Sequence, residues 1–116
     1  MKQKKVFNKL LRDKIPEIIK NNGGNPEFEI LSDESYMASL KEKLREECEE
    51  IINAKTKQEI TEELADVMEV MLCIGKINSI DFEDIEKTRK IKNEKRGSFK
   101  SRVFLKSSTL VAKMQK

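Results

Sequence analysis

Residues 44–66 read LREECEEIINAKTKQEITEELAD, and this stretch governs how the chain is expected to fold. It holds two acidic clusters separated by twelve residues. Each cluster contains two carboxylates three positions apart: Glu47 with Glu50, and Glu63 with Asp66. Residues three apart on an α-helix lie on the same side, about one turn from each other. Each cluster is therefore expected to present a pair of oxygen ligands on a helix.

The residues between the two clusters predict a tight turn between two helices. Residues 56–59, TKQE, match a capping box, in which Thr and Glu side chains satisfy backbone N–H groups at a helix start. A connection this short makes the helices before and after it antiparallel neighbours. Reflection about the turn places Glu47 level with Asp66 and Glu50 level with Glu63. All four carboxylates are therefore expected to meet in one layer.

The helix before the turn is predicted by an apolar stripe with steps of three and four residues. Its members are Met37, Leu40, Leu44, Cys48 and Ile51. Ser32 or Asp33 suits the N-cap, and the helix is expected to run to about Ala54. At about 100° per residue, Glu46 lies near Glu50 beside the stripe, whereas Glu49 points toward solvent.

Shorter elements flank these two helices. Pro16 suits the first turn of a short helix that residues 21–24, NNGG, bring to an end. A fourth helix is expected from near Asp81 to Gly97.

The expected fold is mainly all-α: a helical bundle formed through oligomerisation. From Val67 to Ile74 the third helix is apolar nearly all round, with Glu69 the exception. Such a helix is normally buried on most sides. A chain of 116 residues has room for only a modest core, so a second subunit is expected to cover this helix, giving a homodimer or homotetramer. A small two-stranded β element from residues 28–31 and 102–105 is also expected.

Composition excludes several classes of function. The sequence has no His, which removes Ser-His and Cys-His nucleophiles, the usual zinc sites and imidazole as a general base. We expect no signal peptide and no membrane span, because no apolar run is long enough. Cys48 and Cys73 lack CxxC spacing and are expected to be reduced core thiols of a cytoplasmic protein.

The carboxylates themselves predict a metal centre. Acidic residues at helical spacing usually form a solvated face, but Glu63 and Asp66 border a surface expected to be buried, where lone carboxylates are costly. No Lys or Arg occurs between Lys57 and Lys76 to neutralise them. The hard divalent ion that suits such oxygen ligands is Mg²⁺, with Mn²⁺ as an alternative, and this ion indicates phosphate chemistry.

Positive charge is concentrated toward the two ends of the chain. The candidate phosphate-binding cations are Lys9, Arg12, Lys14, Lys92, Lys95, Arg96 and Arg102. Residues 33–69 are strongly acidic, whereas residues 87–116 are strongly basic. A basic tail also occurs in nucleic-acid-binding proteins, so charge alone does not choose between a metal enzyme and a binding module.

Three ordered blocks of sequence resemble a known family. The acidic clusters resemble the EExxE…ExxD signature of the MazG-like all-α nucleoside triphosphate pyrophosphohydrolases. Residues 8–17, NKLLRDKIPE, look like the NKLVRDKIPE start of the phosphoribosyl-ATP pyrophosphohydrolase-like branch. Residues 95–105, KRGSFKSRVFL, fit the ERGGFxxRxxL pattern of that branch, with Ser98 in place of a Gly. The resemblance covers about residues 6–105, and we expect one domain over residues 1–105 and a C-terminal tail over residues 106–116.

The resemblance implies Mg²⁺-dependent cleavage of a nucleoside triphosphate between the α and β phosphates, giving a monophosphate and pyrophosphate. The implied metal ligands are Glu47, Glu50, Glu63 and Asp66. The implied catalytic set is Glu46, Glu47 and Glu50, with Glu46 supporting the site or positioning water. Lys92, Lys95 and Arg96 match the family's basic positions. A nucleotide, rather than nucleic acid or a membrane, is then the expected partner.

Two alternatives remain open from the sequence. The first is hydrolysis of phosphoribosyl-ATP in histidine biosynthesis, which uses the same chemistry on another substrate. The second is a non-catalytic helical module that contacts nucleic acid or a partner protein through its basic end.

Overall fold

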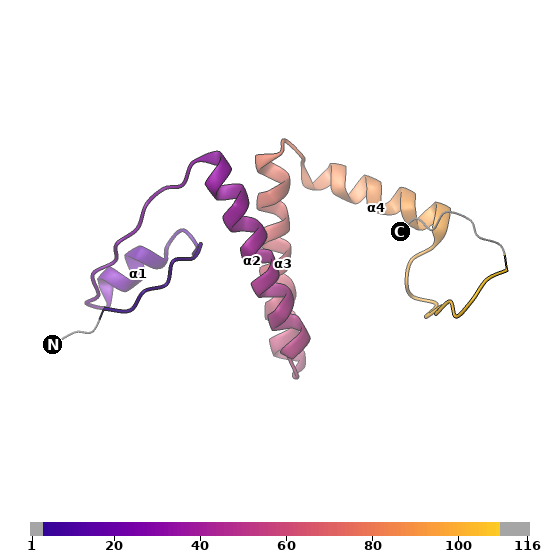
Figure 1. Ribbon diagram of the computed structural model, residues 1–116, viewed down its shortest axis with the longest axis horizontal. Helices are drawn as coiled ribbons and strands as arrows, with labels where there is room; N and C mark the ends of the chain where they lie inside the picture. The colour runs from indigo at the N-terminus through magenta and orange to yellow at the C-terminus, as the bar shows by residue number, and fades with distance from the viewer. Residues whose placement is uncertain (1–3, 110–116) are drawn as a thin grey trace. The chain divides into compact units, whose positions relative to one another are not determined.

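The computed structural model describes residues 4–109, which form helices and connecting segments without strands (Figure 1). The helices are α1 (Ile15–Asn21), α2 (Asp33–Asn53), α3 (Lys57–Ile77) and α4 (Phe82–Arg96). The prediction of a mainly all-α fold is confirmed. Residues 110–116 of the predicted tail lie outside the described residues. None of the described helices combines the length and apolarity that a membrane span needs.

The chain divides into two compact units, Met1–Phe82 and Glu83–Lys116. In the first unit, α2 and α3 form an antiparallel hairpin, as the tight turn predicts (Figure 1). Thr56 Oγ1 accepts a hydrogen bond from Glu59 N at 3.1 Å, and Glu59 Oε2 accepts one from Lys55 N at 3.3 Å. Ser32 caps α2 in the same way, accepting from Ser35 N at 3.3 Å. These caps confirm where both helices begin.

The α2–α3 hairpin has a thin core. Among the described residues, the apolar side chains that are buried are Leu40, 2% exposed, and Val70, 7% exposed. Glu47 is also buried, at 8% exposed. Cys48 and Cys73 are free thiols as predicted, but the prediction that both lie in the core is wrong, since Cys48 is exposed. The predicted apolar stripe therefore reaches the surface at Cys48.

The first turn of α1 contains Pro16, and the helix stops where Gly23 adopts φ 87°. This left-handed conformation suits Gly, which has no Cβ to obstruct it. Gly24 N then donates a hydrogen bond to Ile19 O at 2.8 Å, which closes the turn. A Cβ at Gly24 would lie only 2.5 Å from Ile19 Cγ2, so this position also needs a residue without a side chain.

In the second unit, α4 ends at Arg96, and Gly97 follows with φ 81°, close to the predicted boundary. The prediction of a β element from residues 28–31 and 102–105 is wrong: both segments are described, and neither forms a strand or bridge. A two-stranded ribbon is marginal in water unless a further apolar surface covers it. Ile30 is 88% exposed and Val103 is 87% exposed, so neither segment has such a cover.

Candidate metal centre

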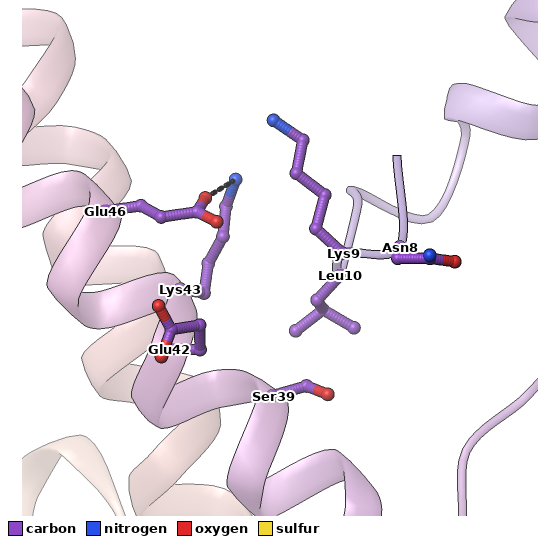
Figure 2. A pocket seen from close by; sticks show the side chains of 7 residues that line it. All are labelled: Asn8, Lys9, Leu10, Ser39, Glu42, Lys43 and Glu46. Carbon is purple, nitrogen blue, oxygen red and sulfur yellow. Dashed lines mark hydrogen bonds and ion pairs between the residues drawn. The ribbon is translucent and has the colours of Figure 1, made fainter. Parts of the chain in front are cut away.

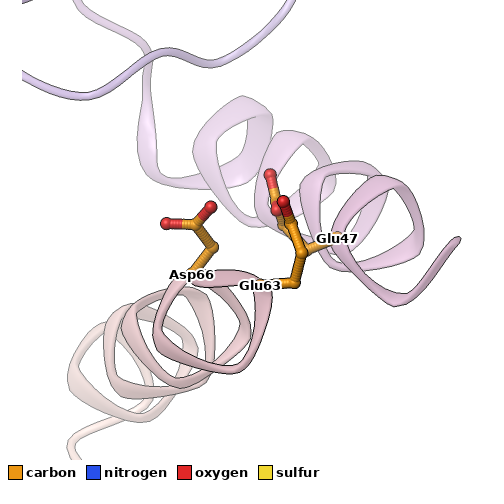
Figure 3. Close-up of side chains that lie close together, drawn as sticks. All are labelled: Glu47, Glu63 and Asp66. Atoms are coloured by element: carbon orange, nitrogen blue, oxygen red, sulfur yellow. The ribbon is translucent and has the colours of Figure 1, made fainter. Parts of the chain in front are cut away.

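Three carboxylates meet on the α2–α3 hairpin. Glu47 comes from α2, and Glu63 and Asp66 come from consecutive turns of α3. One oxygen from each lies within 4.8 Å of the others. Figure 3 shows the carboxylates of Glu47 and Glu63 close together across the two helices, with Asp66 beside them. The sequence-based prediction that the two acidic clusters converge is therefore realised for these three residues.

The electrostatics of the cluster favour a proton or a cation between its carboxylates. Glu63 Oε2 is shielded from solvent and has no hydrogen-bond partner among the described residues. Two ionised carboxylates cannot hydrogen bond to each other, so Glu47 and Glu63 need a shared proton or a cation between them. The pKa of Glu63 is raised, first by a hydrogen bond with Glu47 and then by burial and the charges of Glu47, Asp66 and Glu50.

The residues present fit a hard divalent cation. They supply only carboxylate oxygens, which are the ligands that Mg²⁺ and Mn²⁺ prefer. The shielded Glu63 Oε2, which lacks a partner, is the atom that a cation would satisfy. A set of three protein ligands also leaves coordination positions for water and for substrate phosphate.

Glu50 does not join this group. It is exposed, although its charge still contributes to the raised pKa of Glu63. The sequence places Glu47 level with Asp66 and Glu50 level with Glu63, but in the structure Glu47 faces both α3 carboxylates. Glu50 therefore stays outside the group of three carboxylates, although its charge acts on Glu63. Glu49 is exposed, as predicted.

Two basic side chains contact the cluster. Arg12 Nη2, from the segment before α1, lies 2.7 Å from Asp66 Oδ1. Lys43 Nζ, from α2, lies 3.3 Å from Glu47 Oε1 and 3.4 Å from Glu46 Oε2. Arg12 is one of the predicted cations, whereas the sequence-based reasoning missed Lys43. Its spacing of four residues from Glu47 is the signal that could have identified it.

A pocket lies beside the cluster, between the N-terminal segment and α2 (Figure 2). Its volume is about 300 Å³, including space open to solvent. The residues that line it are Asn8, Lys9, Leu10, Ser39, Glu42, Lys43 and Glu46. Lys9, a predicted phosphate-binding cation, therefore lines this pocket rather than contacting the carboxylates. Glu46 lines the pocket and pairs with Lys43, which in turn contacts Glu47 of the cluster.

The remaining predicted cations lie in two parts of the chain. Lys14 is exposed at the N-cap of α1. The other four belong to the second unit, and they are Lys92, Lys95, Arg96 and Arg102. The first unit therefore supplies the cluster with Arg12 and Lys43 as its contacting cations, among the residues described.

Comparison with known proteins places this geometry in context. Residues 32–98, which include α2, α3 and α4, match the model of the MazG nucleotide pyrophosphohydrolase domain. A curated but uncharacterized protein of Mycolicibacterium smegmatis is 46% identical over 48 residues. That similarity covers 41% of this chain and 49% of the relative, about half its length. No solved structure matches the chain.

Proposed function

The chain belongs to the MazG nucleotide pyrophosphohydrolase domain family, and on this basis we propose that it cleaves a nucleoside triphosphate between the α and β phosphates in an Mg²⁺-dependent reaction. The products are a nucleoside monophosphate and pyrophosphate. The observation that carries the proposal is the group of three carboxylates from two helices, with one shielded oxygen that no described residue hydrogen bonds.

In this proposal Glu47, Glu63 and Asp66 hold the ion, and Glu50 joins them from the edge of the cluster. When bound, Mg²⁺ supplies positive charge that offsets the charge of the phosphates and polarises the phosphorus under attack. Glu46 is half-buried and paired with Lys43, so it is placed to orient the attacking water and accept its proton. Arg12 donates to the phosphate oxygens when substrate replaces its contact with Asp66.

The proposal gives the basic residues of the second unit a role in binding phosphate. They are Lys92, Lys95, Arg96 and Arg102. Support comes from charge: an acidic cluster with one bound ion does not neutralise a triphosphate by itself. Lys14 and Lys9 add positive charge near the N-terminal segment. A cytoplasmic setting is part of the same proposal, supported by the free thiols of Cys48 and Cys73.

The proposal also includes a homodimer or homotetramer, in which α3 contacts a second copy. An exposed apolar stripe runs along α3, made of Ile60, Leu64, Met68 and Met71. These side chains are between 38% and 56% exposed. A single copy buries so little apolar surface that the hairpin alone has little to stabilise it. A matching stripe from another copy would supply the missing contacts by forming a helical bundle.

The test measures pyrophosphate release with Mg²⁺ and with excess chelator. We expect Glu63→Gln and Asp66→Asn each to reduce the rate by at least about 100-fold, because each neutralises a ligand without changing side-chain size. Glu49→Gln is the matched control, since Glu49 is an exposed carboxylate on α2 and outside the cluster. Circular dichroism reports whether the variants stay folded. Release that persists in chelator, or in both variants, refutes the metal mechanism.

The substrate panel includes canonical and modified nucleoside triphosphates and phosphoribosyl-ATP. Preference for phosphoribosyl-ATP would assign the chain to histidine biosynthesis. Salt-sensitive binding of nucleic acid, with no hydrolysis of any member of the panel, would favour the non-catalytic binding module instead.

A further inference from the structure

We infer that the pocket between residues 8–10 and α2 binds the nucleoside part of the substrate, and that Ser39 helps to determine which nucleosides fit. The inference rests on the proposed function, because it places the other end of the same substrate. The carboxylate cluster would contact the phosphates, and the pocket would contact the sugar and the base.

The pocket is built on one face of α2. Ser39, Lys43 and Glu46 follow one another at steps of four and three residues, so they lie along the same side of the helix. Figure 2 shows these side chains extending from α2 toward the segment that carries Lys9 and Leu10. The pocket therefore has a polar wall from the helix and a mixed wall from the N-terminal segment.

The pocket and the carboxylate cluster share a boundary. Lys43 lines the pocket, and its ammonium lies 3.3 Å from Glu47 Oε1, which belongs to the cluster. A single side chain thus separates the two places. A nucleotide whose phosphates lie at the cluster can extend its sugar and base past Lys43 without leaving the first unit.

The charges of the pocket favour a neutral polar ligand over a phosphate. The lining contains two lysines and two glutamates, so it has no net charge. Lys43 is already paired with Glu46 and Glu47, which leaves it less able to bind a free phosphate. Glu42 is paired with Arg45 and Glu46 with Lys43, so the α2 wall of the pocket offers a phosphate no surplus positive charge. Ribose hydroxyls and base amino groups instead donate to such carboxylates.

The remaining lining residues suit a nucleoside. The Ser39 hydroxyl can donate and accept hydrogen bonds, so it can bind a donor or an acceptor of the base, or a sugar hydroxyl. Leu10 offers the apolar contact that the flat face of a base or the carbon side of a sugar needs. A mutation that fills this space should therefore weaken binding of the nucleoside without changing the site for the phosphates.

The test compares two ligands on the full chain with Mg²⁺: a nucleoside triphosphate that the enzyme hydrolyses, and inorganic triphosphate, which lacks the nucleoside. We expect Ser39→Leu to weaken binding of the nucleoside triphosphate by at least about 10-fold, because the larger side chain fills the pocket. Binding of inorganic triphosphate should stay within about twofold. Ala38→Leu is the matched control: it introduces the same side chain one residue away, at an exposed position outside the pocket. It should change neither affinity.

Retained binding of inorganic triphosphate also shows that Ser39→Leu is folded. Ser39→Thr enlarges the side chain less, so we expect a smaller loss of affinity for the nucleoside triphosphate. Equal weakening of both ligands would overturn the inference and make the pocket a phosphate site. No change for either ligand would overturn it too. Failure of the wild-type protein to bind either ligand with Mg²⁺ would instead refute the proposed function. This result is distinct, because it is measured on the wild type and does not depend on the Ser39 variants.

Discussion

Arg12 Nη2 donates a hydrogen bond to Asp66 Oδ1 at 2.7 Å, and this contact joins the N-terminal segment to α3 across 54 positions of sequence. The pKa of Arg12 is raised, chiefly by this hydrogen bond and by the negative charge of Asp66. Arg12 therefore provides positive charge at a carboxylate that we propose as a metal ligand. It also anchors the segment that carries Lys9 and Leu10 into the pocket.

Replacement of Arg12 by Gln should separate metal binding from substrate binding. Mg²⁺ alone should bind more tightly, because a competing cation is lost, whereas the KM for a nucleoside triphosphate should rise. Global stability should fall by less than about 1 kcal/mol, because the ion pair is substantially exposed to solvent. Isothermal titration with Mg²⁺, steady-state kinetics and urea unfolding measure the three effects.

Arg89→Gln is the control for that experiment, since Arg89 forms an ion pair with Glu86 within α4. It should change stability by a similar amount without changing Mg²⁺ affinity. Weaker binding of Mg²⁺ to Arg12→Gln would show that Arg12 supports the metal centre rather than competing with the ion.

The raised pKa of Glu63 predicts how the metal-free protein responds to pH. The ordinary pKa is 4.5, and the folded protein keeps the proton at higher pH than the unfolded chain does. The stabilising contribution is therefore complete below pH 4.5 and is lost as pH rises through the folded-state pKa. In chelator, the Tm of the wild type should fall more steeply across this range than the Tm of Glu63→Gln.

The comparison of wild type with Glu63→Gln also predicts which protein is more stable at high pH. Above the raised pKa, Glu63→Gln should melt at a higher temperature than the wild type, because the amide removes a like charge beside Glu47 and Asp66. Glu62→Gln, an exposed neighbour on α3, should follow the wild type at every pH. Parallel Tm profiles for the wild type and Glu63→Gln would show that folding does not raise the pKa of Glu63.

The exposed stripe on α3 predicts how the protein assembles. Met68→Lys places a charge in the centre of the stripe and should shift the protein toward monomer, because a buried unpaired ammonium is costly. Ala65→Lys adds the same charge at an exposed position of α3 outside the stripe and should leave the assembly intact. Sedimentation velocity over a range of concentrations gives the mass. A wild-type monomer at high concentration would contradict the proposed oligomer.

Leu40 should be the most sensitive apolar position of the hairpin. Its side chain is 2% exposed, so Leu40→Ala should reduce the free energy of unfolding by about 2–5 kcal/mol through lost burial and the cavity left behind. Ile52→Ala, on the same helix but 74% exposed, should cost about 0.5 kcal/mol or less. Urea unfolding monitored by circular dichroism measures both. Equal effects would mean that Ile52 is covered in the assembled protein.

The helix boundaries were predictable because local signals set them. Thr56 and Ser32 cap their helices with the hydrogen bonds that their side chains favour, and Gly97 follows the last turn of α4. The convergence of the two acidic clusters was also predictable, since a short turn between two periodic helices leaves few possible registers, but the pattern set Glu47 level with Asp66 rather than with Glu63. The same pattern placed Glu50 with them in one layer, whereas the structure leaves Glu50 outside the group of three.

Contacts between distant segments were harder to predict. The pairing of residues 28–31 with 102–105 was inferred from alternating apolar residues, but such a ribbon needs a covering surface that the pattern does not show. The contact of Arg12 with Asp66 follows from the path of the chain before α1, which has no periodicity to reveal it. Lys43 was overlooked for another reason: a lysine among glutamates on a helix usually faces solvent, and here its position beside buried Glu47 sets it apart.

The unsatisfied oxygen of Glu63 has a consequence for the lifetime of the protein in a cell. A ligand that binds only the folded form adds to its stability, and at 100 times its Kd the gain is about 2.7 kcal/mol. With the proposed cation bound, that gain would be a large part of the margin against proteolysis, because the hairpin buries so little apolar surface. Shortage of the cation would then lower the amount of this protein as well as its turnover, so abundance itself would track divalent ion supply.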